Sequence, residues 1–243
     1  MNLKLTLEYD GTDFYGWQVQ PDHPTIQQAI EDALEKIVGS RVHVQGAGRT
    51  DAGVHALGQV ASFYCAKEIE PRRLQKGLNA LLRPRVVVKS IESVADGFDA
   101  RRDARSRTYQ YRIWARPWPS VFHGRFAWHV YAPLDIAAME RASVCLKGEH
   151  DFSSFQAAGC DAANPVRRIY RSGFACEGEL LLYNIEATAF LRHMVRNIVG
   201  TLAQVGRGEI SPAGFYEILQ FRNRNQAGPT APAQGLFLVA VDY

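Results

Sequence analysis

The chain has 243 residues, of which 47% are hydrophobic, so it can build one large domain or two small ones with a proper core. Its formal net charge of +3 is too small to establish a nucleic-acid partner. No apolar run approaches the length of a membrane span, and the first residues already alternate as a strand, which leaves no room for a signal peptide. We therefore expect a cytoplasmic protein that makes no contact with a membrane.

The first half of the chain alternates between strand and helix patterns. Its first helix begins at Thr25 with a Thr-x-x-Gln capping box and continues with one apolar face. The expected elements are strand 3–9, a helix from Thr25, strand 42–45, strand 59–64, a helix opened by Pro71 and strand 86–94. This βαββαβ order is that of a ferredoxin-like unit.

The second half is less regular but mixes the same two patterns. Asp135 and Ser211 are suitable N-caps, and Pro212 follows at a first helical position. The expected strands are 107–114, 125–130, 166–176, 179–188 and 236–241, and the expected helices are 135–147, 190–206 and 211–221. The sequence therefore predicts an α+β protein of two ferredoxin-like or RRM-like halves, 1–104 and 105–243, that share a central antiparallel sheet with helices on one side.

The cysteines and histidines are scattered along the chain and form no ligand pattern. Cys65, Cys145, Cys160 and Cys176 include no Cys-x-x-Cys pair, and without a secretory signal they are expected to be reduced core residues. We predict no metal and no cofactor.

The basic residues are mostly arginine, and they are clustered. Of the 28 basic residues 22 are arginine, and seven of these lie between residues 101 and 125 against one acid, Asp103. Tyr109, Tyr111, Trp114 and Trp118 are interleaved with them. Guanidinium groups and aromatic rings together suit RNA, whose bases stack on both. An ordinary arginine-rich surface has the same composition, so the clusters alone do not decide. The candidate RNA-binding residues are Arg101, Arg105, Arg107, Arg167, Arg168 and Arg192.

The most informative segment is the glycine-rich stretch 46–59. It places one guanidinium, Arg49, and one carboxylate, Asp51, on a backbone that glycine leaves unusually free. A surface turn is the simplest reading of an isolated Asp-x-Gly. A dinucleotide-binding loop is excluded, because Asp51 stands where its third glycine would be and no helical period follows.

The string Gly-Arg-Thr-Asp-Ala-Gly-Val-His-Ala in this stretch closely resembles the catalytic loop of the TruA family of tRNA pseudouridine synthases. Three further segments resemble that family's motifs in the same order, and together they span nearly the whole chain. They are Arg-Thr-Tyr-Gln-Tyr-Arg-Ile from 107, Phe-Leu-Arg-His-Met-Val-Arg-Asn-Ile-Val-Gly from 190 and Ala-Gln-Gly-Leu-Phe-Leu from 233. The opening Glu-Tyr-Asp-Gly-Thr from residue 8, with Gly-Trp from 16, also fits.

The resemblance implies a role for each matching residue. It implies that Asp51 is catalytic, that Tyr109 packs against the target base, that Arg196 pairs with the aspartate and that Leu238 helps to close the pocket. We assign Arg49 to the space that the flipped base leaves. The implied activity is isomerisation of uridine to pseudouridine in the anticodon arm of tRNA, at positions 38–40, by a homodimer without a cofactor. Whether the carboxylate attacks base C6, attacks ribose C1′ or assists loss of a ribose proton stays open.

Two other functions compete with this one. A ferredoxin-like RNA-binding protein without activity would keep the basic and aromatic residues, but it has no need for Asp51 within a glycine loop. A glycosidase would need a second positioned carboxylate, which neither the Tyr109 nor the Arg196 segment provides. For the dimer interface, the apolar and aromatic stretch 114–131 is a candidate, with core packing as the simpler explanation.

Overall fold

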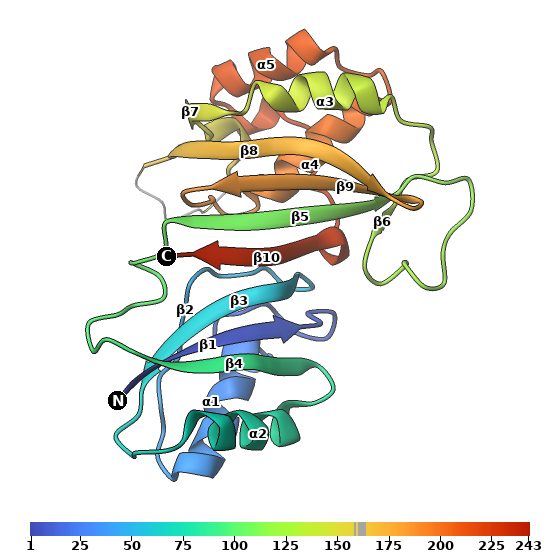
Figure 1. Ribbon diagram of the computed structural model, residues 1–243. Coiled ribbons are helices and arrows are strands. Elements are labelled where there is room, and N and C mark those ends of the chain that lie inside the picture. Colours follow the sequence, from blue (N-terminus) through green and yellow to red (C-terminus); the bar gives the residue numbers. More distant parts are fainter. Residues whose placement is uncertain (158, 160–163) are drawn as a thin grey trace. The chain divides into compact units, whose positions relative to one another are not determined.

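The computed structural model describes residues 1–157, 159 and 164–243. The chain divides into two compact units, one made of Met1–Arg105 with Phe237–Tyr243 and the other of Ser106–Leu236 (Figure 1). The division therefore falls beside the boundary that the sequence placed between 104 and 105. The C-terminal residues, which the sequence placed with the second half, group with the first unit.

The first unit is a sheet of mostly antiparallel strands with two helices. Its elements are β1 (Asn2–Tyr9), α1 (Ile26–Val38), β2 (Gln45–Gly46), β3 (His55–Tyr64), α2 (Pro71–Leu82), β4 (Val86–Val94) and β10 (Leu236–Asp242). The strands lie in the order β4-β1-β3, and β2 pairs with the C-terminal half of β3. This is the sheet order of a ferredoxin-like βαββαβ unit, as the sequence predicted. At the other end of β3, β10 pairs with it in parallel.

Side chains at the start of each helix cap it at the position that the sequence predicted. Thr25 caps α1 by accepting the Gln28 N–H, and Gly39 ends the helix at a φ of 82°. Glu70 caps α2 by accepting the N–H groups of Arg72 and Arg73. The predicted starts of both helices are confirmed.

The strand expected at 42–45 is misplaced, because side chains of α1 form hydrogen bonds with the backbone of Val44. The Val44 N–H donates to the buried Glu31 carboxylate at 3.0 Å, and the Val44 carbonyl accepts from the Gln27 amide at 3.2 Å. Pairing with β3 begins only at Gln45. Val42 and Val44 thus alternate with polar residues because their side chains are buried, and not because this segment pairs in a β-sheet.

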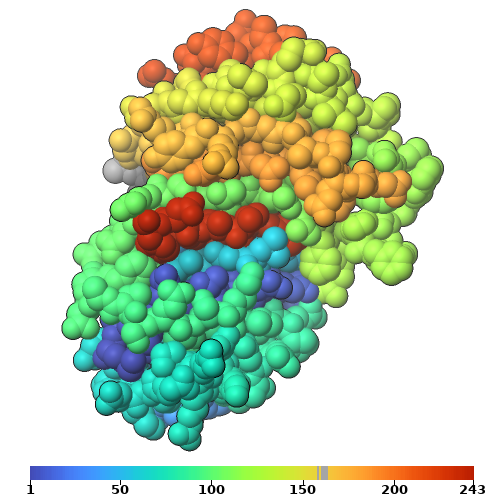
Figure 2. Space-filling model, viewed as in Figure 1, coloured from blue at the N-terminus to red at the C-terminus, as the bar shows by residue number. Residues whose placement is uncertain are grey.

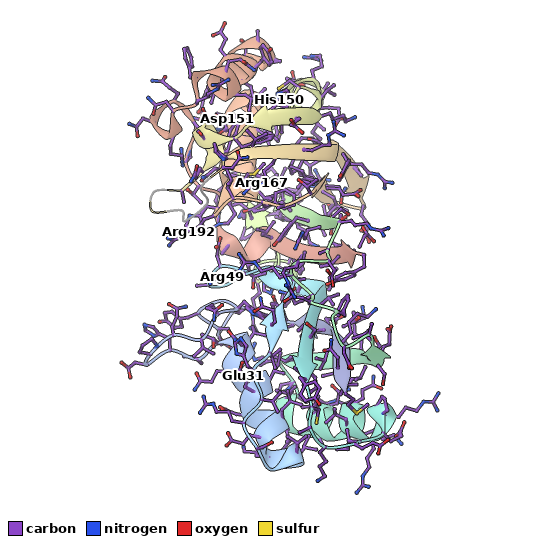
Figure 3. The ribbon with its side chains drawn as sticks, turned by 90° about the vertical axis from the view of Figure 1, so that its left-hand side faces the viewer. Glu31, Arg49, His150, Asp151, Arg167 and Arg192 are labelled. Atoms are coloured by element: carbon purple, nitrogen blue, oxygen red, sulfur yellow. The ribbon has the colours of Figure 1, made fainter. Side chains whose placement is uncertain are left out.

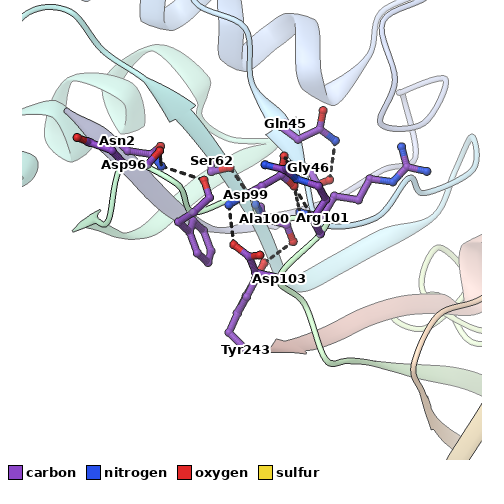
Figure 4. Close-up of polar contacts among 12 residues, drawn as sticks. Asn2, Gln45, Gly46, Ser62, Asp96, Asp99, Ala100, Arg101, Asp103 and Tyr243 are labelled. Carbon is purple, nitrogen blue, oxygen red and sulfur yellow. Dashed lines mark hydrogen bonds and ion pairs between the residues drawn. The ribbon is translucent and has the colours of Figure 1, made fainter.

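Polar contacts order the segment that follows β4 (Figure 4). The Asn2 amide donates to the carbonyls of Ala95, Asp96 and Phe98 at 2.9 to 3.3 Å. The Asp99 carboxylate accepts the N–H groups of Arg101 and Arg102, each at 2.8 Å. Partial burial raises the pKa of Asp99, but these N–H groups and the Arg102 charge outweigh it and hold that pKa below its usual value.

The second unit is an antiparallel sheet with three helices packed against one another. Its elements are β5 (Ser106–Trp114), β6 (Trp128–His129), α3 (Ile136–Val144), β7 (Gly148–Asp151), β8 (Val166–Glu177), β9 (Leu180–Ala187), α4 (Met194–Gly206) and α5 (Pro212–Phe221). Three short 3₁₀ turns complete it, at Ser153–Phe155, Arg224–Gln226 and Ala233–Gly235. The strand order is β5-β9-β8-β7, and β6 pairs with the end of β5. The α+β class with two halves is confirmed.

Several boundaries in the second unit differ from the sequence prediction. The helix expected from 190 begins at Met194, because His193 adopts a left-handed φ of 60° that a continuous helix does not allow. Only Trp128–His129 of the strand expected at 125–130 is paired. The helix expected to reach 147 ends at Val144. The N-caps are confirmed, since Asp135 accepts from the Ala138 N–H and Ser211 from the Gly214 N–H.

The cysteines that the structure describes are free thiols. Cys65 is buried as expected, Cys145 is half-buried, and Cys176 is exposed at the end of β8, so the expectation of a core position is wrong for Cys176. Burial raises the pKa of the Cys145 thiol to about 11. Cys160 lies outside the described residues. Within the described chain, every helix is too short or too polar to cross a membrane.

Candidate active site

The glycine-rich loop between β2 and β3 presents Arg49 and Asp51 in the first unit. Arg49 is exposed (Figure 3) and Asp51 is half-buried. The loop closes in a turn in which the Val54 N–H donates to the Asp51 carbonyl at 3.1 Å. Gly53 makes this turn possible with a φ of 76°. The carboxylate that the sequence singled out therefore stands on a tight turn within four residues of a buried strand.

Hydrogen bonds from three other segments hold this loop. The Tyr9 hydroxyl pairs with Thr50 Oγ1 at 2.9 Å, and the Gln59 amide donates to the Gly48 carbonyl at 2.8 Å. The Trp17 N–H donates to the Thr50 carbonyl at 3.0 Å. All three bonds reach residues just before Asp51, and the Gly53 N–H, just after it, donates to the Phe14 carbonyl at 3.2 Å.

The segment 10–17 lies so close to the loop that only glycine fits at two of its positions. A Cβ on Gly11 would stand 2.0 Å from the Val54 carbonyl oxygen. A Cβ on Gly16, where φ is 86°, would stand 2.5 Å from the Thr50 carbonyl oxygen and 3.1 Å from the Asp51 carbonyl carbon. Both glycines therefore serve a close backbone approach to the loop that carries Asp51.

Tyr9 is the buried centre of this support. Burial raises its pKa to about 12, although the hydrogen bonds with Thr50 and Gln59 lower it. The hydroxyl therefore keeps its proton at neutral pH and can donate to one neighbour while it accepts from another. The sequence motif contained Tyr9 but gave it no role; its alternation as a strand residue was the only signal.

The residues that follow the loop join β3 to the C-terminal strand. His55 is buried, its Nδ1 accepts the Gly11 N–H at 3.1 Å, and its ring stacks on Phe237 with centroids 4.7 Å apart. Leu238 is fully buried and stands opposite Ala56 in the parallel pairing of β10 with β3. Leu238, expected at the pocket wall, thus pairs with the second residue after the end of the glycine-rich loop.

The two tyrosines of β5 differ in what their side chains contact. Tyr109 stands opposite Ile185 and meets the Phe190 ring edge-on at 5.1 Å. Tyr111 is fully buried and donates its hydroxyl proton to the Pro232 carbonyl at 2.7 Å. Burial raises the pKa of Tyr111, and the nearby Arg196 charge partly opposes that rise. Tyr111 is therefore a packing residue, and its role separates from that of Tyr109.

Arg196 lies in the first turn of α4 and is tied to the segment before β10. Its Nε donates to the Ala231 carbonyl at 2.8 Å, and its own carbonyl accepts the Ala231 N–H at 3.1 Å. Arg192 precedes α4, although the helix expected over 190–206 would have contained it. The pairing of Asp51 with Arg196 joins residues of different units and stays a prediction.

The outer arginines fall into three groups. Arg107 donates to the Thr188 carbonyl and Arg167 donates to the carbonyls of Asn164 and Val166, so their guanidinium groups hold backbone. Arg168 lies 3.9 Å from the Glu149 carboxylate. The remaining three, Arg101, Arg105 and Arg192, are exposed, as RNA contacts require.

A family model described as tRNA pseudouridine synthase matches residues 6–101 and 142–243, which is most of the chain. The chain therefore belongs to the tRNA pseudouridine synthase family, a family of isomerases that act on uridine in tRNA. Two curated relatives carry the name tRNA pseudouridine synthase A. One from Myxococcus xanthus is 48% identical over 242 residues, covering 99% of this chain and 91% of the relative. One from Pelobacter propionicus is 42% identical over 241 residues, covering 99% of this chain and 99% of the relative.

A solved Cbf5–Nop10–Gar1 complex is also similar, at 13% identity over 82% of this chain and 54% of the matched one. Its TM-score of 0.34 is too low to support an inference.

Proposed function

We propose that this enzyme isomerises uridine in the anticodon arm of tRNA, at positions 38–40, with Asp51 as its catalytic residue and no cofactor. The observation that carries the proposal is the loop that presents Asp51. Residues just before Asp51 are bonded to Tyr9, Trp17 and Gln59, and the Gly53 N–H just after it donates to the Phe14 carbonyl. Such support holds a reacting carboxylate in one geometry, which is worth several orders of magnitude in rate.

The chemistry breaks the bond between ribose C1′ and base N1 and makes one between C1′ and base C5. The base gains a proton at N1 and loses the one at C5, so atoms and electrons balance within the nucleotide and water. An ionised carboxylate aimed at the nucleotide is the group this reaction needs. We assign that group to Asp51, and we assign Arg196 to keeping it ionised, because a nearby positive charge favours the charged form.

Flipping the target base out of its stack costs a few kcal/mol. We propose that Arg49 fills the vacated space, since it is exposed on the same loop as Asp51. We assign Tyr109 to receiving the base, since its ring meets Phe190 edge-on, whereas Tyr111 is fully buried and its hydroxyl bonds to Pro232. Leu238 supplies an apolar wall from β10.

The decisive experiment measures release of tritium from C5 of labelled uridine in tRNA by Asp51→Asn. The amide has the shape of the carboxylate but cannot act as nucleophile or base. We expect no detectable release and nearly unchanged tRNA affinity. Asp32→Asn, an exposed aspartate of α1, is the matched control and should keep the parent rate. Release by Asp51→Asn above a few per cent of the parent rate would remove Asp51 from catalysis.

We further propose that the enzyme works as a homodimer in the cytoplasm. Support for a second copy comes from the loop between β5 and β6, which lies at the surface as the yellow-green segment of Figure 2. In this loop Val121 is 91% and Phe122 85% exposed. Core packing, the simpler explanation for this stretch, does not account for side chains so exposed. Sedimentation at micromolar protein should give twice the chain mass of 27.2 kDa. A monomer that modifies tRNA at full rate would contradict the dimer and leave Asp51 untouched.

A further inference from the structure

The second unit carries an open cavity of about 550 Å³ at the start of α4. Arg192 and His193 line it on the helix side, and Arg224 and Thr230 line it from the segment after α5. Neither Tyr109 nor Arg196 lines it, so the cavity is separate from the second-unit residues assigned to the reaction. Its volume suits a nucleotide-sized group.

The wall of this cavity is fixed against α4. The Gly228 N–H donates to Thr201 Oγ1 at 2.9 Å, and the Thr230 hydroxyl donates to Asn197 Oδ1 at 2.6 Å. A Cβ on Gly200 would stand 1.7 Å from the Pro229 carbonyl oxygen, so helix and segment are in direct backbone contact. The cavity is therefore preformed.

The charge of the described residues around this cavity is positive. Arg224 is half-buried, and within this part of the chain its guanidinium donates to neutral oxygens, those of Ala227, Asn197 and Thr230. Burial lowers the pKa of Arg224, as expected for a cation without a neighbouring anion. Arg192 is exposed (Figure 3), and within the described chain it too has no carboxylate within ion-pair distance. Other arginines of this unit do have such partners: Arg116 with Glu179, Arg171 with Glu186, Arg207 with Glu209 and Arg222 with Asp151.

The backbone adds to this positive potential. α4 is 13 residues long, and no side chain caps its N-terminus at His193. The partial positive charge of that terminus therefore faces the residues that line the cavity. No acidic residue is among the described residues of the lining.

We propose that this cavity binds a backbone phosphate of the tRNA, with Arg192 and Arg224 as its two guanidinium ligands and the N-terminus of α4 behind it. This rests on tRNA being the substrate of the proposed function. Arg192 was a candidate RNA contact from sequence, whereas no sequence pattern singled out Arg224. A phosphodiester fits because a guanidinium fork can contact two of its oxygens at once.

The first test compares Arg192→Gln with Arg141→Gln. Arg141 is an exposed arginine of α3 that does not line the cavity, so both variants lose one surface charge. We expect Arg192→Gln to weaken tRNA binding about tenfold, as loss of one hydrogen bond to a charged group does. The slope of log affinity against log salt should become less negative by about one. Arg141→Gln should change both quantities far less. Equal effects of the two variants would overturn the proposal.

The second test locates the phosphate. Ethylation of individual tRNA phosphates should weaken binding of the parent enzyme at several positions. At one of these positions ethylation should not weaken binding of Arg192→Gln, while at all the others it should weaken binding of both enzymes. Arg224→Lys, which keeps the charge and loses the fork, should lose sensitivity at that same position. An unchanged interference pattern in both variants refutes the site. A second outcome also refutes it. Inorganic phosphate could raise the melting temperature of the parent and not that of Arg192→Gln, while the ethylation interference pattern is the same for both. The cavity would then bind free phosphate and not a phosphate of the tRNA.

These results are independent of catalysis, because they are measured on binding. If Asp51→Asn retained turnover, the catalytic proposal would fail and the phosphate site would stand. If the interference patterns were unchanged while Asp51→Asn was inactive, only the phosphate site would fail.

Discussion

Gly16→Ala should separate the geometry of the loop that carries Asp51 from the stability of the fold. An alanine at this left-handed position costs about 1 to 2 kcal/mol in backbone strain alone. Its Cβ would also stand 2.5 Å from the Thr50 carbonyl oxygen, and ordinary contact begins at 3.4 Å, so the two segments must separate by 0.9 Å beside Asp51. A displacement near 1 Å at a reacting group costs about 100-fold in rate.

Gly39→Ala is the matched control for this substitution. Gly39 has nearly the same φ, 82° against 86°, but nothing lies within 4 Å of its Cβ position. Both variants should therefore lose stability in urea unfolding, Gly16→Ala more because of its added clash, and only Gly16→Ala should lose rate per folded molecule.

The assay is single-turnover release of tritium from C5 of labelled uridine in tRNA with enzyme in excess, corrected for the folded fraction. Rates of Gly16→Ala and Gly39→Ala within about threefold of each other would refute the claim that this close approach positions Asp51, because the predicted displacement costs about 100-fold.

Three further predictions concern residues around the proposed site. Arg196→Ala should reduce the rate more than the stability, and Arg196→Lys should restore only part of the lost rate, because a point charge replaces a fork. If Arg196→Ala is mostly unfolded but its remaining folded molecules are fully active, the pairing with Asp51 is contradicted. Tyr109→Leu should lose activity by the equivalent of about 1 to 3 kcal/mol of base stacking. Tyr111→Leu should mainly lose stability in urea, because its buried hydroxyl bonds to Pro232; similar rate losses at both tyrosines would show that neither stacks on a base. Stability should fall as pH rises from about 10 to about 12, since the folded state holds the Tyr9 proton more tightly than the unfolded chain does. Tyr9→Phe should reduce this loss of stability when the free energy of unfolding is measured at each pH. An unchanged loss would mean that another group causes it.

Sequence signals that act through neighbouring residues predicted the fold well. The caps at Thr25, Asp135 and Ser211 each satisfy a backbone N–H three residues ahead, so the helix starts follow from spacing alone. The hairpin of β8 and β9 follows from Glu177-Gly178, where Gly178 takes a φ of 58°. These features need no knowledge of distant partners.

Features that depend on distant partners were not predictable from spacing. Val44 looks like a strand residue, but its N–H is taken by Glu31, which lies 13 residues earlier on a helix. Phe190 fits the apolar stripe of α4, yet the left-handed His193 separates it from that helix. The edge strand Gly148–Asp151 was missed because its polar residues show no alternation, and it exists only because β8 pairs with it.

The candidate site was predicted in its residues and not in its support. The glycine-rich loop pointed to Asp51, but nothing in the spacing showed that Tyr9, Trp17 and Gln59 bond to the residues just before it. The Tyr9 bond joins residues 41 apart and the Gln59 bond joins residues 11 apart, and neither separation leaves a local pattern. Arg224 was not predicted for the same reason, because only the folded structure shows that it lines the cavity with Arg192.

Residues 237–243 return to the first unit, and this has a consequence during synthesis. Phe237 stacks on His55, and the Tyr243 hydroxyl donates to the Ala100 carbonyl across 143 positions of sequence. A ribosome makes roughly 5 to 20 residues per second. The unit that carries Asp51 therefore completes its sheet only some seconds after its other strands have been made. A nascent chain that has not reached residue 236 holds the whole glycine-rich loop and still lacks the strand that pairs beside it.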